Sequence, residues 1–224
     1  IPNNLAWWVV NASDRTIIAH FLGTAANGIY SIANKFPNVF INFYNILNLS
    51  WTETVSLHYG DEDRDEFLTE TMTSLFKLFA AACFGIVACM PFIFPILINT
   101  KYDAAYNQIL ILMYAMLFRV LVGLYSCVYV AQKNAKKIAY TSISAAIINI
   151  TVDLILINKI QVFAVSVSTL VAFLSMFVIR YIDVNKTVHM KIRKPIIVGS
   201  VLIGGMLIGT YYCGNKIIQF VALC

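Results

Sequence analysis

The sequence predicts an all-α fold, a polytopic bundle of transmembrane helices. Hydrophobic residues make up 60% of the chain and charged residues only 12%, whereas about a quarter of the residues of soluble domains are charged. The apolar residues gather in stretches of the length that a bilayer-spanning helix needs, about 20 residues. Short polar connections separate these stretches, which favours antiparallel neighbours. The composition therefore excludes an ordinary soluble domain.

Proline, glycine and charged residues divide the chain into eight expected helices. The first seven should cover residues up to 21, then 27–59, 65–98, 104–131, 136–157, 161–182 and 195–213, and an eighth begins near Lys216. The second and third are longer than a bilayer requires, so they should tilt or kink. Pro37 is a natural kink site in the second. The chain opens with Ile1 and ends inside an apolar run, so we expect a piece of a longer polytopic protein.

Lysine and arginine in the short connections predict the orientation, because cationic loops stay in the cytoplasm. The connection 132–136, together with Lys137 directly after it, carries three lysines, and the connection 183–194, with Arg180 counted at its start, carries most of the remaining cations of this half. We expect both loops to be cytoplasmic. The acidic connection around residues 60–66 should then lie on the same side.

Five asparagines recur along the second expected helix at spacings of four, four, three and three residues. At about 100° per residue, such spacings place them in one narrow stripe. They are Asn34, Asn38, Asn42, Asn45 and Asn48. One or two amides could hydrogen-bond across a helix interface. Five in register favour the wall of a wet cavity, because lipid exposure is excluded for such groups.

Arg119 lies near the middle of the expected helix 104–131. A cation at mid-membrane costs at least about 2.5–3.5 kcal/mol, and no acidic residue is expected at the same depth. This suggests an anionic ligand, since guanidinium groups match phosphate oxygens. Gln108 falls close to the same helix face. Arg15 and Lys35 are further cations of the same region, with an ion pair to Asp14 as the alternative for Arg15 and snorkelling to the interface as the alternative for Lys35.

Asp14 lies within the first expected helix and Asp153 within the fifth. They are candidates for ion coupling, with structural pairing or a position at the membrane interface as alternatives. The five cysteines are scattered without metal or redox spacing, so no metal site and no cofactor is expected. No basic run is interleaved with aromatics as in single-strand binders, so no nucleic acid is expected as a partner. No nucleophile elbow, phosphate loop or catalytic carboxylate pair occurs, and the outer loops are too short for a membrane glycosyltransferase or ligase.

Four stretches carry a family resemblance: "LAWWVVNASDRTII" (5–18), "FLGTAANGIYSIANKFP" (21–37), "DRDEF" (63–67) and "AAIINITVDLILI" (145–157). In this order the sequence resembles polysaccharide exporters of the Wzx flippase type, in the superfamily of MATE multidrug exporters and lipid II flippases. The resemblance implies that residues 1–183 form the second six-helix lobe of a transporter, and that residues 184–224 form a cytoplasmic loop and additional transmembrane helices. It also implies a first lobe elsewhere in the same chain.

The resemblance implies a multi-pass protein of the cell membrane that flips polyprenyl-pyrophosphate-linked oligosaccharide to the outer leaflet for surface polysaccharide biosynthesis. The implied partners are this lipid-linked oligosaccharide, the membrane lipids, the first lobe and polysaccharide polymerase machinery. We expect Arg119, Arg15 and Lys35 to balance the pyrophosphate, and the asparagine row with Gln108 to contact the glycan. A lipid II exporter or a multidrug exporter is the nearest alternative.

Overall fold

The predicted all-α fold is confirmed. The structure, a computed structural model, describes residues 2–213, with side chains for residues 12–212, and no strand occurs in this part of the chain. Its elements are α1 (Pro2–Ala33), α2 (Lys35–His58), α3 (Arg64–Leu97), η1 (Thr100–Ala105), α4 (Tyr106–Ala131), α5 (Ala135–Ile160), α6 (Val162–Val184) and α7 (Lys194–Cys213). The helix expected from Lys216 onward lies outside the described residues.

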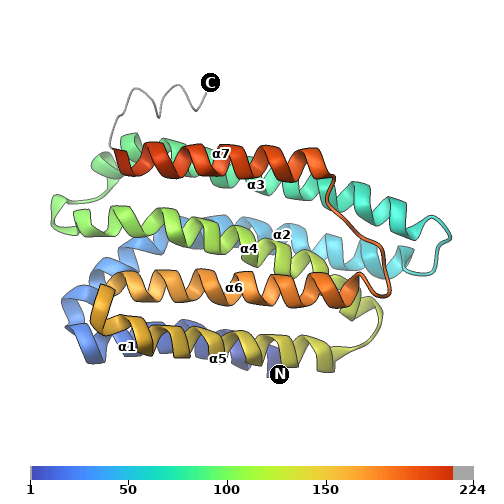
Figure 1. Ribbon diagram of the computed structural model, residues 1–224, viewed down its shortest axis with the longest axis horizontal. Coiled ribbons are helices and arrows are strands. Elements are labelled where there is room, and N and C mark those ends of the chain that lie inside the picture. The colour runs from blue at the N-terminus through green and yellow to red at the C-terminus, as the bar shows by residue number, and fades with distance from the viewer. Residues whose placement is uncertain (1, 214–224) are drawn as a thin grey trace.

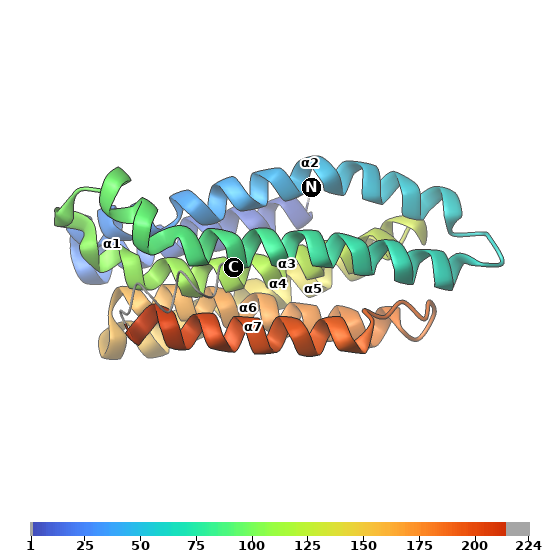
Figure 2. The ribbon, with the colours of Figure 1, turned by 90° about the horizontal axis from the view of Figure 1, so that it is seen from above.

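The helices run side by side as an elongated bundle (Figures 1 and 2). The connections α2–α3, α4–α5 and α6–α7 meet at one end of the bundle, and α3–α4 and α5–α6 lie at the other (Figure 1). The central element is α4, which packs against α2, α3 and α6, while α5 packs against α1 and α6. The loops 132–136 and 183–194 therefore lie at one end, as their shared charge predicts.

Five helical segments are long and apolar enough to cross a membrane: Arg64–Leu97, Thr100–Ala131, Ala135–Ile160, Val162–Val184 and Lys194–Tyr212. The sequence predicts that α1 and α2 cross as well, but within the described residues these two are not among the five. Their polar residues, above all the asparagine row, lower the hydropathy. They nonetheless run alongside the apolar helices (Figure 1), an arrangement that polar helices tolerate where protein or water covers their polar face.

The expected boundary between the first two helices, residues 22–26, is found as a break inside α1, which as a whole extends to Ala33. The break lies at Gly23, whose φ of 84° and ψ of 177° leave the helical region. A positive φ of this kind is readily adopted only by glycine. The second interruption, at Asn34, comes three residues before Pro37. Proline lacks an N–H to bond Ala33 and its ring crowds that carbonyl, so the kink expected from Pro37 lies one turn upstream of it.

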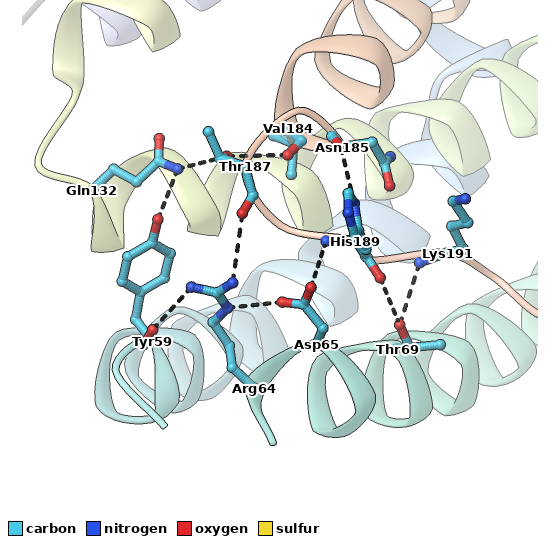
Figure 3. A network of polar contacts seen from close by, with 10 residues as sticks. All are labelled: Tyr59, Arg64, Asp65, Thr69, Gln132, Val184, Asn185, Thr187, His189 and Lys191. Carbon is cyan, nitrogen blue, oxygen red and sulfur yellow. Dashed lines mark hydrogen bonds and ion pairs between the residues drawn. The ribbon is translucent and has the colours of Figure 1, made fainter. Parts of the chain in front are cut away.

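The three connections at one end are joined by a polar network (Figure 3). Gln132 donates to the hydroxyls of Tyr59, at 2.9 Å, and Thr187, at 3.0 Å. The extended segment 187–193, which we call the strap, continues from there along α3. Its backbone N–H at His189 donates to Asp65 Oδ2 at 3.0 Å, and Val188 beside it is fully buried. The strap therefore holds the α6–α7 connection against the start of α3.

Candidate functional site

Two pockets open on the face formed by α1, α2, α4 and α6. The first, the arginine pocket, has a volume of about 280 Å³ and is lined by Tyr44, Asn45, Asn48, Thr52, Arg119, Val122, Gly123, Ser126, Cys127, Val130, Ile138 and Arg180. The second, the asparagine pocket, has a volume of about 320 Å³ and is lined by Asp14, Arg15, Tyr30, Asn34, Asn38, Ile41, Asn42, Asn45 and Arg119. The two share Asn45 and Arg119, so they adjoin.

The asparagine row follows the wall of both pockets. Asn34, Asn38 and Asn42 line the asparagine pocket, Asn48 lines the arginine pocket, and Asn45 belongs to both. The helical period of α2 brings them to one side, because residues three and four apart lie on the same helix face. The structure thus places every amide of the predicted row at a cavity, instead of between tightly packed helices.

Two guanidinium groups line the arginine pocket, Arg119 from α4 and Arg180 from α6. The expected position of Arg180 at the start of the loop 183–194 is wrong, because Arg180 belongs to α6 and its side chain is buried at 1% exposure. Its Nε and Nη2 donate to Thr141 Oγ1 at 3.0 and 2.9 Å. Nη2 also donates to Ser142 Oγ at 3.3 Å, and Nη1 donates to the carbonyl of Val122 at 3.1 Å.

All these partners of Arg180 are neutral, and among the residues that the structure describes no carboxylate lines the arginine pocket. Arg119 contacts apolar groups, with its guanidinium carbon 5.9 Å from the ring centre of Phe173 and Nη1 4.0 Å from Met116 Sδ. Two positive charges therefore border a pocket without a carboxylate in its wall. Such a site favours an anion, because guanidinium groups bind oxyanions by charge-assisted hydrogen bonds.

A buried polar cluster borders the asparagine pocket at Asp14. Asp14 Oδ2 accepts hydrogen bonds from the hydroxyls of Tyr30, at 2.7 Å, and Thr169, at 3.3 Å. Asp153, from α5, accepts from Ser168 at 2.5 Å, and its carboxyl neighbours that of Asp14. The side chain of Asp153 is fully buried.

Three oxygens in this cluster are buried without a hydrogen-bond partner: Asp14 Oδ1, Asn149 Oδ1 and Asp153 Oδ2. Buried polar atoms are normally paired, so such oxygens require an explanation. They come from α1 and α5, which pack together. A proton shared between the carboxyls or a small cation would satisfy them.

The structure brings some predicted site residues to the pockets and leaves others away from them. Arg15 is exposed and lines the asparagine pocket. Lys35 is exposed at the start of α2 and lines neither pocket. Gln108 is buried below the surface, where its Oε1 accepts from Ser166 at 3.4 Å, and it also lines neither pocket.

Sequence reasoning missed several residues of the arginine pocket. Tyr44 and Thr52 share a face of α2 with Asn48 at a spacing of four residues, a signal that could have found them. Arg180 carried a weaker signal: it follows residues 162–179, a largely apolar stretch without a charged residue. A cation inside an apolar run, as opposed to after it, is a candidate for the bundle interior.

Comparison with known protein families identifies the family of this chain. The family model MatE matches residues 1–155, more than half of the chain. The chain belongs to the MatE family. This MatE match spans α1 to most of α5, and so includes the asparagine row, Asp14 and Arg119, whereas Arg180 lies beyond it. No curated protein matches the chain, and no solved structure does.

MatE proteins are membrane transporters and not enzymes. The apolar helices agree with this, since five segments are suited to cross a bilayer. The chain is thus a multi-pass membrane protein of a transporter family. The resemblance to this superfamily is confirmed at that level.

Proposed function

We propose that this MatE protein flips a polyprenyl-pyrophosphate-linked oligosaccharide from the cytoplasmic to the outer leaflet of the cell membrane, for surface polysaccharide biosynthesis. The observation that carries the proposal is the junction of the two pockets. A site with two arginines and no carboxylate in its wall adjoins a site with four amides, and Arg119 borders both. A pyrophosphate joined to sugars needs such a pair of neighbouring environments.

The chemistry of each pocket supports one part of this substrate. Arg119 and Arg180 offer charge-assisted donors to the phosphate oxygens. The amides of Asn34, Asn38 and Asn42 both donate and accept, as sugar hydroxyls require, and Arg15 adds a cation beside them. Lys35 lies outside both pockets, so we leave it out of the proposed site. The lipid tail remains in the bilayer while the headgroup crosses by alternating access between two lobes.

The orientation that we propose has the loops 132–136 and 183–194 in the cytoplasm. Their positive charge supports this, and so does their position at one end of the bundle (Figure 1). The proposed partners are the first lobe, which would cover the open face of the pockets, the surrounding lipids and polysaccharide polymerase machinery. Asp14 and Asp153 are the proposed site of ion coupling.

One observation favours a second function, the export of cationic drugs. The carboxyl of Asp14 borders the asparagine pocket, and an acidic group would attract a cationic drug. Lipid II export would use the same pyrophosphate chemistry as the first proposal. Drug resistance of cells that express the protein separates the drug exporter from both pyrophosphate transporters.

The test replaces Arg119 by Lys, Gln and Glu in the full-length protein and measures surface polysaccharide and membrane protein level. Export should fall at normal protein level, most with Glu and least with Lys, because the anion needs the positive charge. Lys35→Gln, outside both pockets, is the matched control and should export normally. Normal export with Arg119→Gln would mean that the pyrophosphate does not bind at this site.

A further inference from the structure

We infer that Asn48 belongs to an oxyanion subsite in the arginine pocket, where its amide acts as a fixed N–H donor beside Arg119 and Arg180. Tyr44 is the residue that positions this amide. This inference rests on the proposed function and assigns the asparagines of the row to two different parts of the ligand. Asn48 faces phosphate, whereas Asn34, Asn38 and Asn42 face sugar.

The amide of Asn48 is oriented by a neighbour. Its Oδ1 accepts a hydrogen bond from the hydroxyl of Tyr44 at 2.6 Å. This bond engages the oxygen inside the protein. The NH₂ group is what Asn48 can offer a ligand in the pocket, and this group only donates.

Tyr44 is itself fixed in place. Its side chain is buried at 4% exposure, and its ring packs edge-on against Phe79 with 5.3 Å between ring centres. Gly123 of α4 makes room for the ring, because a Cβ at this glycine would lie 2.7 Å from Tyr44 Cζ. A hydroxyl held on both sides in this way keeps the oxygen of Asn48 turned away from any ligand.

Arg180 is oriented by the same means. A guanidinium has five N–H groups, and four of these are used on Thr141, Ser142 and Val122. The fifth, on Nη1, remains for the pocket that Arg180 lines. Asn48 and Arg180 therefore both present N–H donors from fixed supports. This suits an acceptor-only phosphate and not a sugar hydroxyl, which must also donate.

The experiment measures binding of inorganic pyrophosphate to the full-length protein in detergent by titration calorimetry. Asn48→Asp keeps the shape of the side chain and replaces the NH₂ donor by an anionic acceptor, so the Kd should rise at least tenfold. Tyr44→Phe keeps the ring on Phe79 and removes the hydroxyl that orients the amide, so the Kd should rise about threefold. Asn107→Asp, at an exposed position of α4 outside both pockets, is the matched control and should change the Kd less than twofold.

The outcomes separate this inference from the proposed function. If Arg180→Gln weakens pyrophosphate binding but Asn48→Asp does so no more than Asn107→Asp, the oxyanion subsite is overturned and the proposed function stands. If the wild-type protein does not bind pyrophosphate at all, both are overturned. Variants are compared only at equal thermal stability in the same detergent, and Tyr44→Phe supplies the result if Asn48→Asp does not fold.

Discussion

Tyr44 of α2 lies directly over Gly123 of α4, so close that a Cβ on the glycine would collide with the Tyr44 hydroxyl oxygen. The two helices approach one another here beside the arginine pocket, which both residues line. Trp51, two turns further along α2, ties the same helices together by donating from Nε1 to the carbonyl of Leu124 at 3.1 Å. The size of the residue at 123 therefore sets how closely α2 and α4 can pack.

Gly123→Ala should destabilise the protein by about 1–3 kcal/mol, the usual range for overpacking a filled interior. The ring of Tyr44 is buried against Phe79, so it has little room to turn aside. Thermal unfolding in detergent measures the effect. Gly85→Ala is the control, because a Cβ there meets nothing within 4 Å, and this change should be neutral or slightly stabilising. Equal effects at Gly123 and Gly85 would contradict the close approach.

Arg180→Met should leave the stability within about 1 kcal/mol of wild type while pyrophosphate binding is lost. Buried charges are often replaced by apolar residues of similar size at no cost in stability. The groups around Arg180 also keep other bonds, since the Thr141 hydroxyl still donates to the carbonyl of Lys137 at 2.9 Å. Thermal unfolding and pyrophosphate titration measure the two effects separately.

Arg193→Met serves as the control for Arg180→Met. Arg193 is exposed and forms a surface ion pair with Glu70 at 2.6 Å, so its replacement should alter neither stability nor binding. A loss of more than about 3 kcal/mol in Arg180→Met, comparable to breaking a buried pair, would make Arg180 a structural residue and not a ligand-binding one.

Most of the fold could be predicted from the sequence, because apolar runs and their punctuation are local signals. The observed α3 begins at Arg64 and the observed α6 ends at Val184, each within two residues of its prediction. The asparagine row could be predicted as well, because the helical period alone places Asn38 and Asn42 on one face. The break at Gly23 falls within residues 22–26, where the sequence predicts the boundary between the first two helices.

The site depends on partners far apart in the sequence, and this limits what a single sequence can predict. Arg180 bonds Val122 from 58 residues away, and Thr169 reaches Asp14 from 155 residues away. Lys35 and Gln108 resemble site residues by type and helix, but only tertiary packing decides whether they reach a pocket. Helical periodicity assigns a residue to a face of its helix and does not identify the neighbouring helix.

Asp153→Asn should make transport independent of the driving ion while the protein still folds. Asp153 and Asp14 are neighbouring carboxyls with buried oxygens that lack a hydrogen-bond partner, and an amide keeps the shape while it removes the exchangeable charge. Transport into vesicles is measured with a proton gradient, a sodium gradient and neither. Asp103→Asn, on the exposed η1 turn, is the control and should keep its ion dependence. Unchanged ion dependence in Asp153→Asn would exclude the pair from coupling.

Thr69→Val should loosen the strap, residues 187–193, from α3. The Thr69 hydroxyl donates to the carbonyl of His189 at 3.3 Å and accepts from the N–H of Lys191 at 3.4 Å (Figure 3). Valine keeps the shape and removes both bonds, at a cost of about 1 kcal/mol. This corresponds to about fivefold more of the detached strap, because 1.4 kcal/mol is a factor of ten.

Limited trypsin digestion of the protein in detergent measures the detached strap, since the enzyme cuts after Lys191 and Arg193. The rate of cleavage at these two sites should rise about fivefold in Thr69→Val, in line with the population estimate. Thr151→Val is the matched control, because the Thr151 hydroxyl donates within α5, to the carbonyl of Ile147 at 2.7 Å. Equal cleavage of the two variants would mean that the buried side chains of Val188 and Met190, and not the hydrogen bonds of Thr69, hold the strap in place.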